Sequence, residues 1–95
     1  MIQPTKKAQT VLKPLLENPT PAILREAARV FAELGDYREA ESLQARFLQL
    51  PGKATFQDWS YLGDIRYSAG NRSAAQRAYR QALAVAEINL QSQPP

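Results

Sequence analysis

The side chains available for chemistry in this sequence are carboxylates, hydroxyls and basic groups, because the chain has neither cysteine nor histidine. That composition excludes thiolate and imidazole metal ligands, cysteine and histidine nucleophiles, and Ser-His-Asp triads. Asp58 and Asp64 are six residues apart, on different faces of a helix, and so form no carboxylate pair. Ser60, Ser68 and Ser73 have no base to activate them. Since there is also no glycine-rich phosphate loop, we expect no enzymatic activity, no cofactor and no metal.

Arg25 and Arg29 are the basic residues whose spacing suits binding. They lie one helical turn apart, so their guanidinium groups could jointly hold a carboxylate or an acidic peptide segment. The alternative is a pair of solvated arginines that answer Glu26 and Glu33 on an ordinary surface. The spacing alone leaves both interpretations open.

The composition is that of one small folded domain. The chain has 95 residues, of which 44% are hydrophobic and 22% charged, so wholesale disorder is not expected. The net charge of +3 is mild and favours a solvated mixed-charge surface over a nucleic-acid footprint. There is no secretory signal pattern and no apolar run of about 20 residues, so we expect no membrane span and, by default, a cytoplasmic location.

The elements that must position these groups come from an internal repeat of 35 residues. It aligns Gly35 with Gly70 and Ala40 with Ala75. Within each unit the apolar residues recur at i, i+3, i+4 and i+7, which predicts amphipathic helices. The predicted helices cover residues 21–34, 37–50, 56–69 and 72–90. A fifth helix is expected over residues 5–18, which Pro14 should kink or shorten.

Residues at the predicted helix ends agree with this pattern. Thr20 precedes a proline, and Thr55 stands three residues before Asp58 with capping-box spacing. Gly35 and Gly70 are placed where a helix ends in a left-handed residue. Asp36 and Glu39 form a second box of the same spacing.

Five apolar stripes are expected to form the core, with small residues allowing helices to approach closely and large ones filling the space between them. In chain order they are Val11, Leu12, Leu15 and Leu16; Leu24, Ala27, Ala28, Phe31 and Leu34; Ala40, Leu43, Phe47 and Leu50; Phe56, Trp59, Leu62, Gly63 and Ile65; and Ala75, Ala78, Tyr79, Ala82, Leu83 and Ala86.

The second unit carries a Trp, Leu-Gly, Ala, aromatic, Ala pattern that resembles a tetratricopeptide repeat. The residues that carry the resemblance are Trp59, Leu62, Gly63, Ala75, Tyr79 and Ala82, with Gly70 at the turn. The second unit departs from the pattern in having Arg66 where an aromatic residue is usual and in lacking the closing proline. The first unit is a weaker match, with Leu24 in place of the tryptophan and Gln44 in place of the second aromatic residue. We expect the stem of Arg66 to pack while its head reaches solvent or an acidic neighbour.

The resemblance covers residues 20–90 and implies an all-α fold of about five helices, with antiparallel helix-turn-helix pairs stacked as a short right-handed α-solenoid. The implied units are a partial repeat helix over 1–19, repeats over 20–54 and 55–90, and a disordered tail over 91–95. The family implies a non-enzymatic module that binds a partner peptide or helix in a groove lined by the first helix of each repeat. Carried onto this chain, that groove comprises Ala22, Arg25, Arg29, Glu33, Gln57, Ser60, Asp64, Tyr67 and Ser68.

The last predicted helix offers a second candidate surface, because stacked repeats need a cap over their apolar ends. In this helix Val85 and Ile88 fall off the expected inner stripe, and Leu90 follows them. These residues predict a homo-oligomer or a docked protein partner; the alternative is scattered surface apolar residues.

An RNA-binding protein of pentatricopeptide type is the other class considered, because that family also has 35-residue helical units and this chain is basic. Its members use many repeats, one for each base, so nucleic acid is the less favoured partner.

Overall fold

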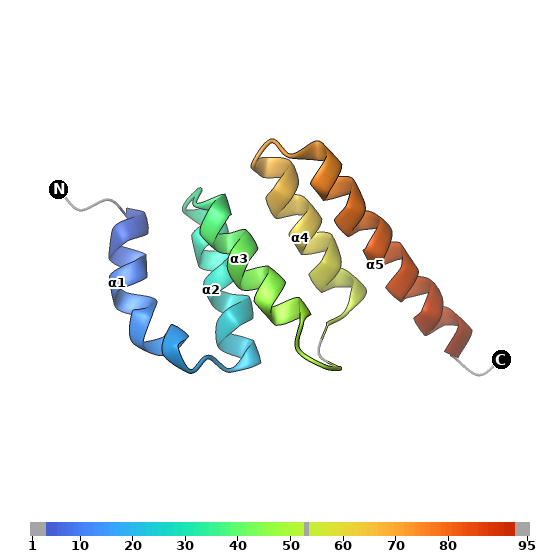
Figure 1. The fold of residues 1–95 in the computed structure, drawn as a ribbon, viewed down its shortest axis with the longest axis horizontal. Helices are drawn as coiled ribbons and strands as arrows, with labels where there is room; N and C mark the ends of the chain where they lie inside the picture. The colour runs from blue at the N-terminus through green and yellow to red at the C-terminus, as the bar shows by residue number, and fades with distance from the viewer. Residues whose placement is uncertain (1–3, 53, 93–95) are drawn as a thin grey trace.

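The computed structural model describes residues 4–52 and 54–92 and consists, over these residues, of five α-helices without strands (Figure 1). The prediction of an all-α fold is confirmed. The helices follow one another along an elongated molecule of 57 × 29 × 16 Å. They are α1 (Pro4–Glu17), α2 (Pro21–Glu33), α3 (Tyr37–Leu48), α4 (Phe56–Ser68) and α5 (Arg72–Ser92).

Helices α2 and α3 form one hairpin, and α4 and α5 form a second. The first helix of each hairpin, α2 or α4, begins with the same kind of cap. Thr20 and Thr55 have extended backbones, and the hydroxyl of each accepts a hydrogen bond from the N–H three residues later. Pro21 occupies the first turn of α2, where its missing N–H costs no helical hydrogen bond. Asp58 completes a full capping box with Thr55. These local signals fix where α2 and α4 start.

The turn inside each hairpin also repeats. Gly35 and Gly70 have φ angles of +83° and +88°, a left-handed conformation that β-carbons disfavour. Asp36 and Asn71 follow, and their side chains accept hydrogen bonds from the backbone N–H groups of Glu39 and Ala74. The 35-residue repeat of the sequence is therefore also a repeat of backbone geometry.

The hydrophobic core is centred on α2 and α3, and α4 packs against them. Phe31 and Phe47 are fully buried among small and branched residues of the predicted stripes. Between α4 and α5, Gly63 lies directly beneath the ring of Tyr79, so close that a β-carbon there would overlap the ring. The small residue thus allows the aromatic ring to lie on the helix backbone, as the stripes predicted.

Several core predictions are wrong in detail. Leu34 and Phe56 are exposed, because each lies at a helix end where no neighbouring helix covers it. Trp59 and Tyr79 are half-buried rather than buried. Gln44 is completely buried, although it belongs to none of the predicted apolar stripes.

Helix α1 continues through Pro14, so the expected shortening does not occur. Its apolar residues do not share one environment. Leu12 and Leu16 pack against the core cluster, whereas Val11 and Leu15 are 63% and 48% exposed. A single helix edge, rather than a whole face, holds α1 to the bundle.

The orientation of α5 also differs from the prediction. Its buried stripe runs through Ala75, Ala78 and Ala82 and continues to the half-buried Val85, while Leu83 is 65% exposed. The prediction had placed Leu83 inside and Val85 outside. Steps of three and four residues along α5 keep Val85 on the side of Ala78 and Ala82, and Leu83 projects elsewhere. The predicted tail is wrong for residues 91 and 92, which belong to α5, and its residues 93–95 lie outside the described part.

Candidate functional site

The candidate site is a hollow of about 240 Å³ between α2 and α4. Arginines and a glutamate of α2 form one wall, and an aspartate and a tyrosine of α4 form the other. The lining residues are Arg25, Glu26, Arg29, Asp58 and Tyr61. The hollow therefore contains both arginines of the predicted groove, together with two α4 residues, Asp58 and Tyr61, that the sequence had not assigned to it.

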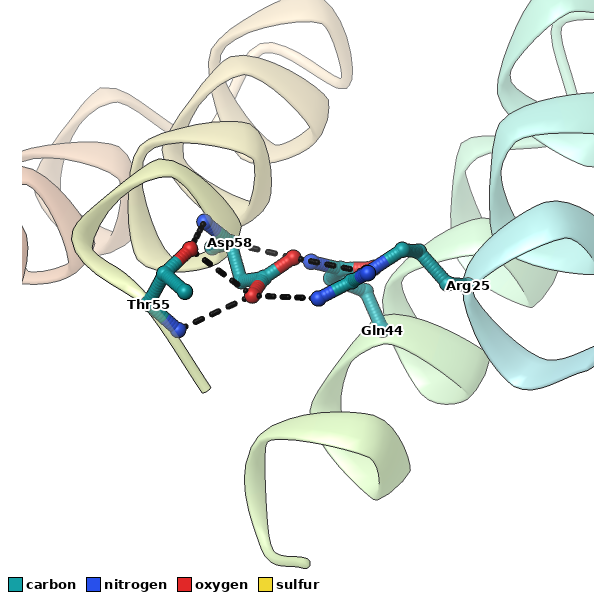
Figure 2. Close-up of polar contacts among 4 residues, drawn as sticks. All are labelled: Arg25, Gln44, Thr55 and Asp58. Carbon is teal, nitrogen blue, oxygen red and sulfur yellow. Dashed lines mark hydrogen bonds and ion pairs between the residues drawn. The ribbon is translucent and has the colours of Figure 1, made fainter. Parts of the chain in front are cut away.

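Asp58 is the polar centre of this site, with 7% of its surface exposed (Figure 2). Arg25 reaches from α2 and donates from Nε to Oδ1 at 3.1 Å and from Nη2 to Oδ2 at 2.9 Å. The backbone N–H and the hydroxyl of Thr55 donate to Oδ2 at 2.9 and 3.0 Å. One carboxylate thus caps α4 and binds a planar guanidinium fork from α2, which holds the two helices in register.

The same cluster extends into α3. The guanidinium carbon of Arg25 lies 4.4 Å from the ring centre of Phe47, a cation–π distance. The side chain of Gln44 donates from Nε2 to the backbone carbonyl of Asp58 at 2.9 Å. Its Oε1 accepts no hydrogen bond from the described residues. Arg25, Gln44 and Asp58 therefore join α2, α3 and α4 at one point.

Arg29 points to acids of its own helix. It forms ion pairs with Glu26, three residues before it, and with Glu33, whose Oε1 is 2.6 Å from Nη1. These contacts raise the pKa of Arg29, and the hydrogen bond from Arg29 lowers the pKa of Glu26. For Arg29 the structure supports the interpretation of a solvated arginine that pairs with neighbouring glutamates. Arg25 differs, because its partner is Asp58, 33 residues later in the chain.

Tyr61 lies among these charges, half-buried between α2 and α4. Its pKa is raised, first by burial and then by the negative charge of Glu33, with a smaller contribution from Asp64. Arg29 acts in the opposite direction. The tyrosine ring therefore lies among charged side chains of both signs.

The remaining residues of the predicted groove are spread over α4. Gln57, Asp64, Tyr67 and Ser68 are exposed, and Ser60 is half-buried. Two of these side chains contact α5. Tyr79 donates a hydrogen bond to Asp64 at 2.6 Å, which raises the pKa of Tyr79 to about 12. The guanidinium carbon of Arg72 lies 5.7 Å from the ring centre of Tyr67. Ala22 of α2 is exposed as well.

The expectation for Arg66 is confirmed. Its Nε donates to Glu41 of α3 at 2.9 Å and its Nη1 to the carbonyl of Ala74 of α5 at 3.2 Å. On α5, the predicted docking residues have mixed exposure: Ile88 and Leu90 are 61% and 68% exposed, and Val85 is half-buried.

Comparisons with protein-family models, with curated proteins and with solved structures gave no match to this chain. Within the described ranges, no three His, Cys, Asp or Glu side chains gather as metal ligands. No helix of those ranges is both long and apolar enough to cross a bilayer.

Proposed function

We propose that this chain is a non-enzymatic protein-interaction module of the tetratricopeptide-like kind, stacked as a short right-handed solenoid, in which the hollow between α2 and α4 receives a segment of a partner protein. The observation that carries the proposal is the site itself. The hollow of about 240 Å³ is lined by one aromatic ring, that of Tyr61, and otherwise by charged side chains. Aromatic anchors surrounded by polar groups are the usual composition of a recognition site.

The charged groups around Tyr61 are already hydrogen-bonded to one another without a ligand, which supports a role in recognition. Asp58 and Arg25 hold each other through two hydrogen bonds, and Thr55 fixes the same carboxylate. Because these side chains are already ordered, a ligand does not have to immobilise them when it binds.

The charge of the site favours a basic partner segment. Arg25 and Arg29 share the lining with the acids Glu26 and Asp58, and the negative charges of Glu33 and Asp64 also act on Tyr61. An acidic segment, which the arginine spacing suggested, would compete with carboxylates that already occupy two N–H donors of Arg25 and three of Arg29. A lysine or arginine of the partner could donate hydrogen bonds to the lone pairs that remain on Glu26 and Glu33, and an apolar residue after it could pack on the ring of Tyr61.

Selection from a phage library of random peptides, followed by titration of the synthetic hits, tests the proposal. We expect hits rich in basic and apolar residues, and the Glu26→Lys/Glu33→Lys variant should bind them at least about tenfold more weakly. The matched control is Glu17→Lys/Glu39→Lys, which makes the same change of charge outside the groove and should bind as the wild type does.

Three outcomes oppose this proposal in different ways. Acidic hits would restore the partner expected from the arginine pair. Equal binding by the groove variant and its control would place recognition elsewhere. Absence of peptide hits, with binding of a single-stranded RNA oligonucleotide at low salt, would favour the RNA-binding class.

A further inference from the structure

The outer face of α5 carries leucines that no other part of residues 4–52 and 54–92 covers. Leu83 and Leu90 are 65% and 68% exposed. Residues seven apart on an α-helix differ by only about 20° in direction, so these two side chains lie along one stripe. Leu83 and Leu90, with Gln76 one heptad earlier, are called the outer stripe below.

The internal repeat indicates what kind of surface the outer stripe is. Leu48 of α3 stands 35 residues before Leu83 and therefore occupies the same place in its hairpin. Leu48 is half-buried and shares a hollow with Trp59 and Leu62 of α4. The position that a neighbouring helix covers on α3 is thus left open on α5, which points to a helix as the missing neighbour.

The charges beside the stripe identify that helix. Arg80 and Glu87 are exposed, three residues before and four residues after Leu83, and neither forms an ion pair with another described residue. We propose that α5 pairs with α5 of a second copy, antiparallel, with Leu83 at the two-fold axis. In that arrangement Arg80 of each chain lies opposite Glu87 of the partner subunit.

Self-complementarity is what a two-fold interface requires, because the same patch must serve as both halves. The near-symmetric placement of Arg80 and Glu87 about Leu83 meets this requirement only for antiparallel helices. In a parallel pair the Arg80 and Glu87 side chains of the two helices would lie on opposite sides of the interface, so neither charge would gain an opposite partner. The charge pattern therefore selects both the occupant and its direction.

The length of α5 leaves room for this contact. The helix has 21 residues, whereas α4, its partner in the hairpin, has 13. Figure 1 shows its C-terminal part extending past the start of α4. Since a single helix face forms the interface, association should be weak, with a dissociation constant on the order of 10–100 µM. Self-association on α5 is independent of peptide binding between α2 and α4.

Sedimentation equilibrium of the full chain, from about 10 µM to about 1 mM, tests the pairing. The wild type should pass from monomer to dimer. Arg80→Glu and Glu87→Arg, each of which places like charges together at two symmetric points, should each weaken the dimer roughly ten- to hundredfold. The double variant Arg80→Glu/Glu87→Arg exchanges the charges and should restore most of the affinity.

Arg77→Glu is the matched control, since Arg77 is exposed on α5 but points about 120° away from Leu83. It should dimerise as the wild type does, and circular dichroism should show the same helix content for all variants. A wild type that stays monomeric at about 1 mM overturns the proposal. A dimer that ignores both single reversals, or one that the double variant fails to restore, overturns it as well.

Discussion

Replacing Asp58 by asparagine tests most directly whether the contacts of Asp58 with Arg25 and Thr55 hold α2 and α4 together. Asparagine is nearly the same size as aspartate, but its amide has one acceptor oxygen where the carboxylate has two. Four donors now converge on that carboxylate: two from Arg25 and two from Thr55, at 2.9–3.1 Å. In the variant at least one of these donors loses its acceptor, and the charge–charge attraction to Arg25 is lost.

The expected magnitude follows from two contributions. The hydrogen bond from the Thr55 N–H to the Asp58 carboxylate, which is the N3 half of the capping box, contributes about 1 kcal/mol. The ion pair contributes about 0.5–1 kcal/mol, because the Arg25 side chain is 52% exposed and water screens it. We therefore expect Asp58→Asn to lower the free energy of unfolding by about 2 kcal/mol. For a domain of this size the Tm would fall by about 8–16 °C.

Urea denaturation measures this change, with the fluorescence of Trp59, the only tryptophan of the chain, and helical circular dichroism as two probes. Asp64→Asn is the matched control, because that exposed carboxylate accepts one hydrogen bond, from Tyr79. It should cost less than about 1 kcal/mol. If Asp58→Asn changes stability by less than about 0.5 kcal/mol, or by no more than the control does, then the cluster does not hold α2 and α4 together.

Two further predictions concern the contact between α4 and α5. Gly63→Ala should lower the free energy of unfolding by about 1–2 kcal/mol, because overlap with the Tyr79 ring outweighs the better helix propensity of alanine. The loss should shrink in a Tyr79→Leu background, and equal losses in both backgrounds, measured by urea denaturation, would contradict the packing argument. Folding raises the pKa of Tyr79 from 10.0 to about 12, chiefly through its hydrogen bond to Asp64. The protonated phenol therefore stabilises the fold below about pH 10, and this contribution disappears as the pH rises through about 12. Comparison of unfolding free energies across that interval should show a smaller decline for Tyr79→Phe than for the wild type, and parallel curves would refute the assignment.

The pattern of agreement between sequence and structure follows the distance over which each interaction acts. The caps at Thr20 and Thr55 and the turns at Gly35 and Gly70 were predictable, because each depends on residues within about four positions along the chain. The ion pairs of Arg29 with acids three residues before and four residues after it are of the same kind and were anticipated as one alternative.

The partner of Arg25 was not predictable in this way. Its spacing from Thr55 explained Asp58 fully as part of the capping box of α4. Nothing in the neighbouring sequence indicates that the same carboxylate binds Arg25 of α2, 33 residues earlier. The 35-residue repeat offered a partial signal, since it places the first helices of the two units at equivalent positions in their hairpins. Tyr61 was likewise not predicted to line the groove, because its position there depends on how α2 and α4 pack together.

The sequence by itself determined that the chain forms helices, where most of them begin and end, and that the hairpin is repeated, because caps, glycine turns and apolar periodicity are short-range properties. Apolar periodicity also predicted most of the buried residues of α2 and α3, whereas tertiary structure alone decided which arc of α5 is buried. Periodicity defines an apolar stripe only to within about one residue, and the angle at which helices pack then selects Val85 for the inside of α5 and Leu83 for the outside. The burial of Gln44 against the Asp58 carbonyl and the contact of Arg25 with the Asp58 carboxylate also depend on tertiary structure, because both exist only once α2, α3 and α4 are packed together.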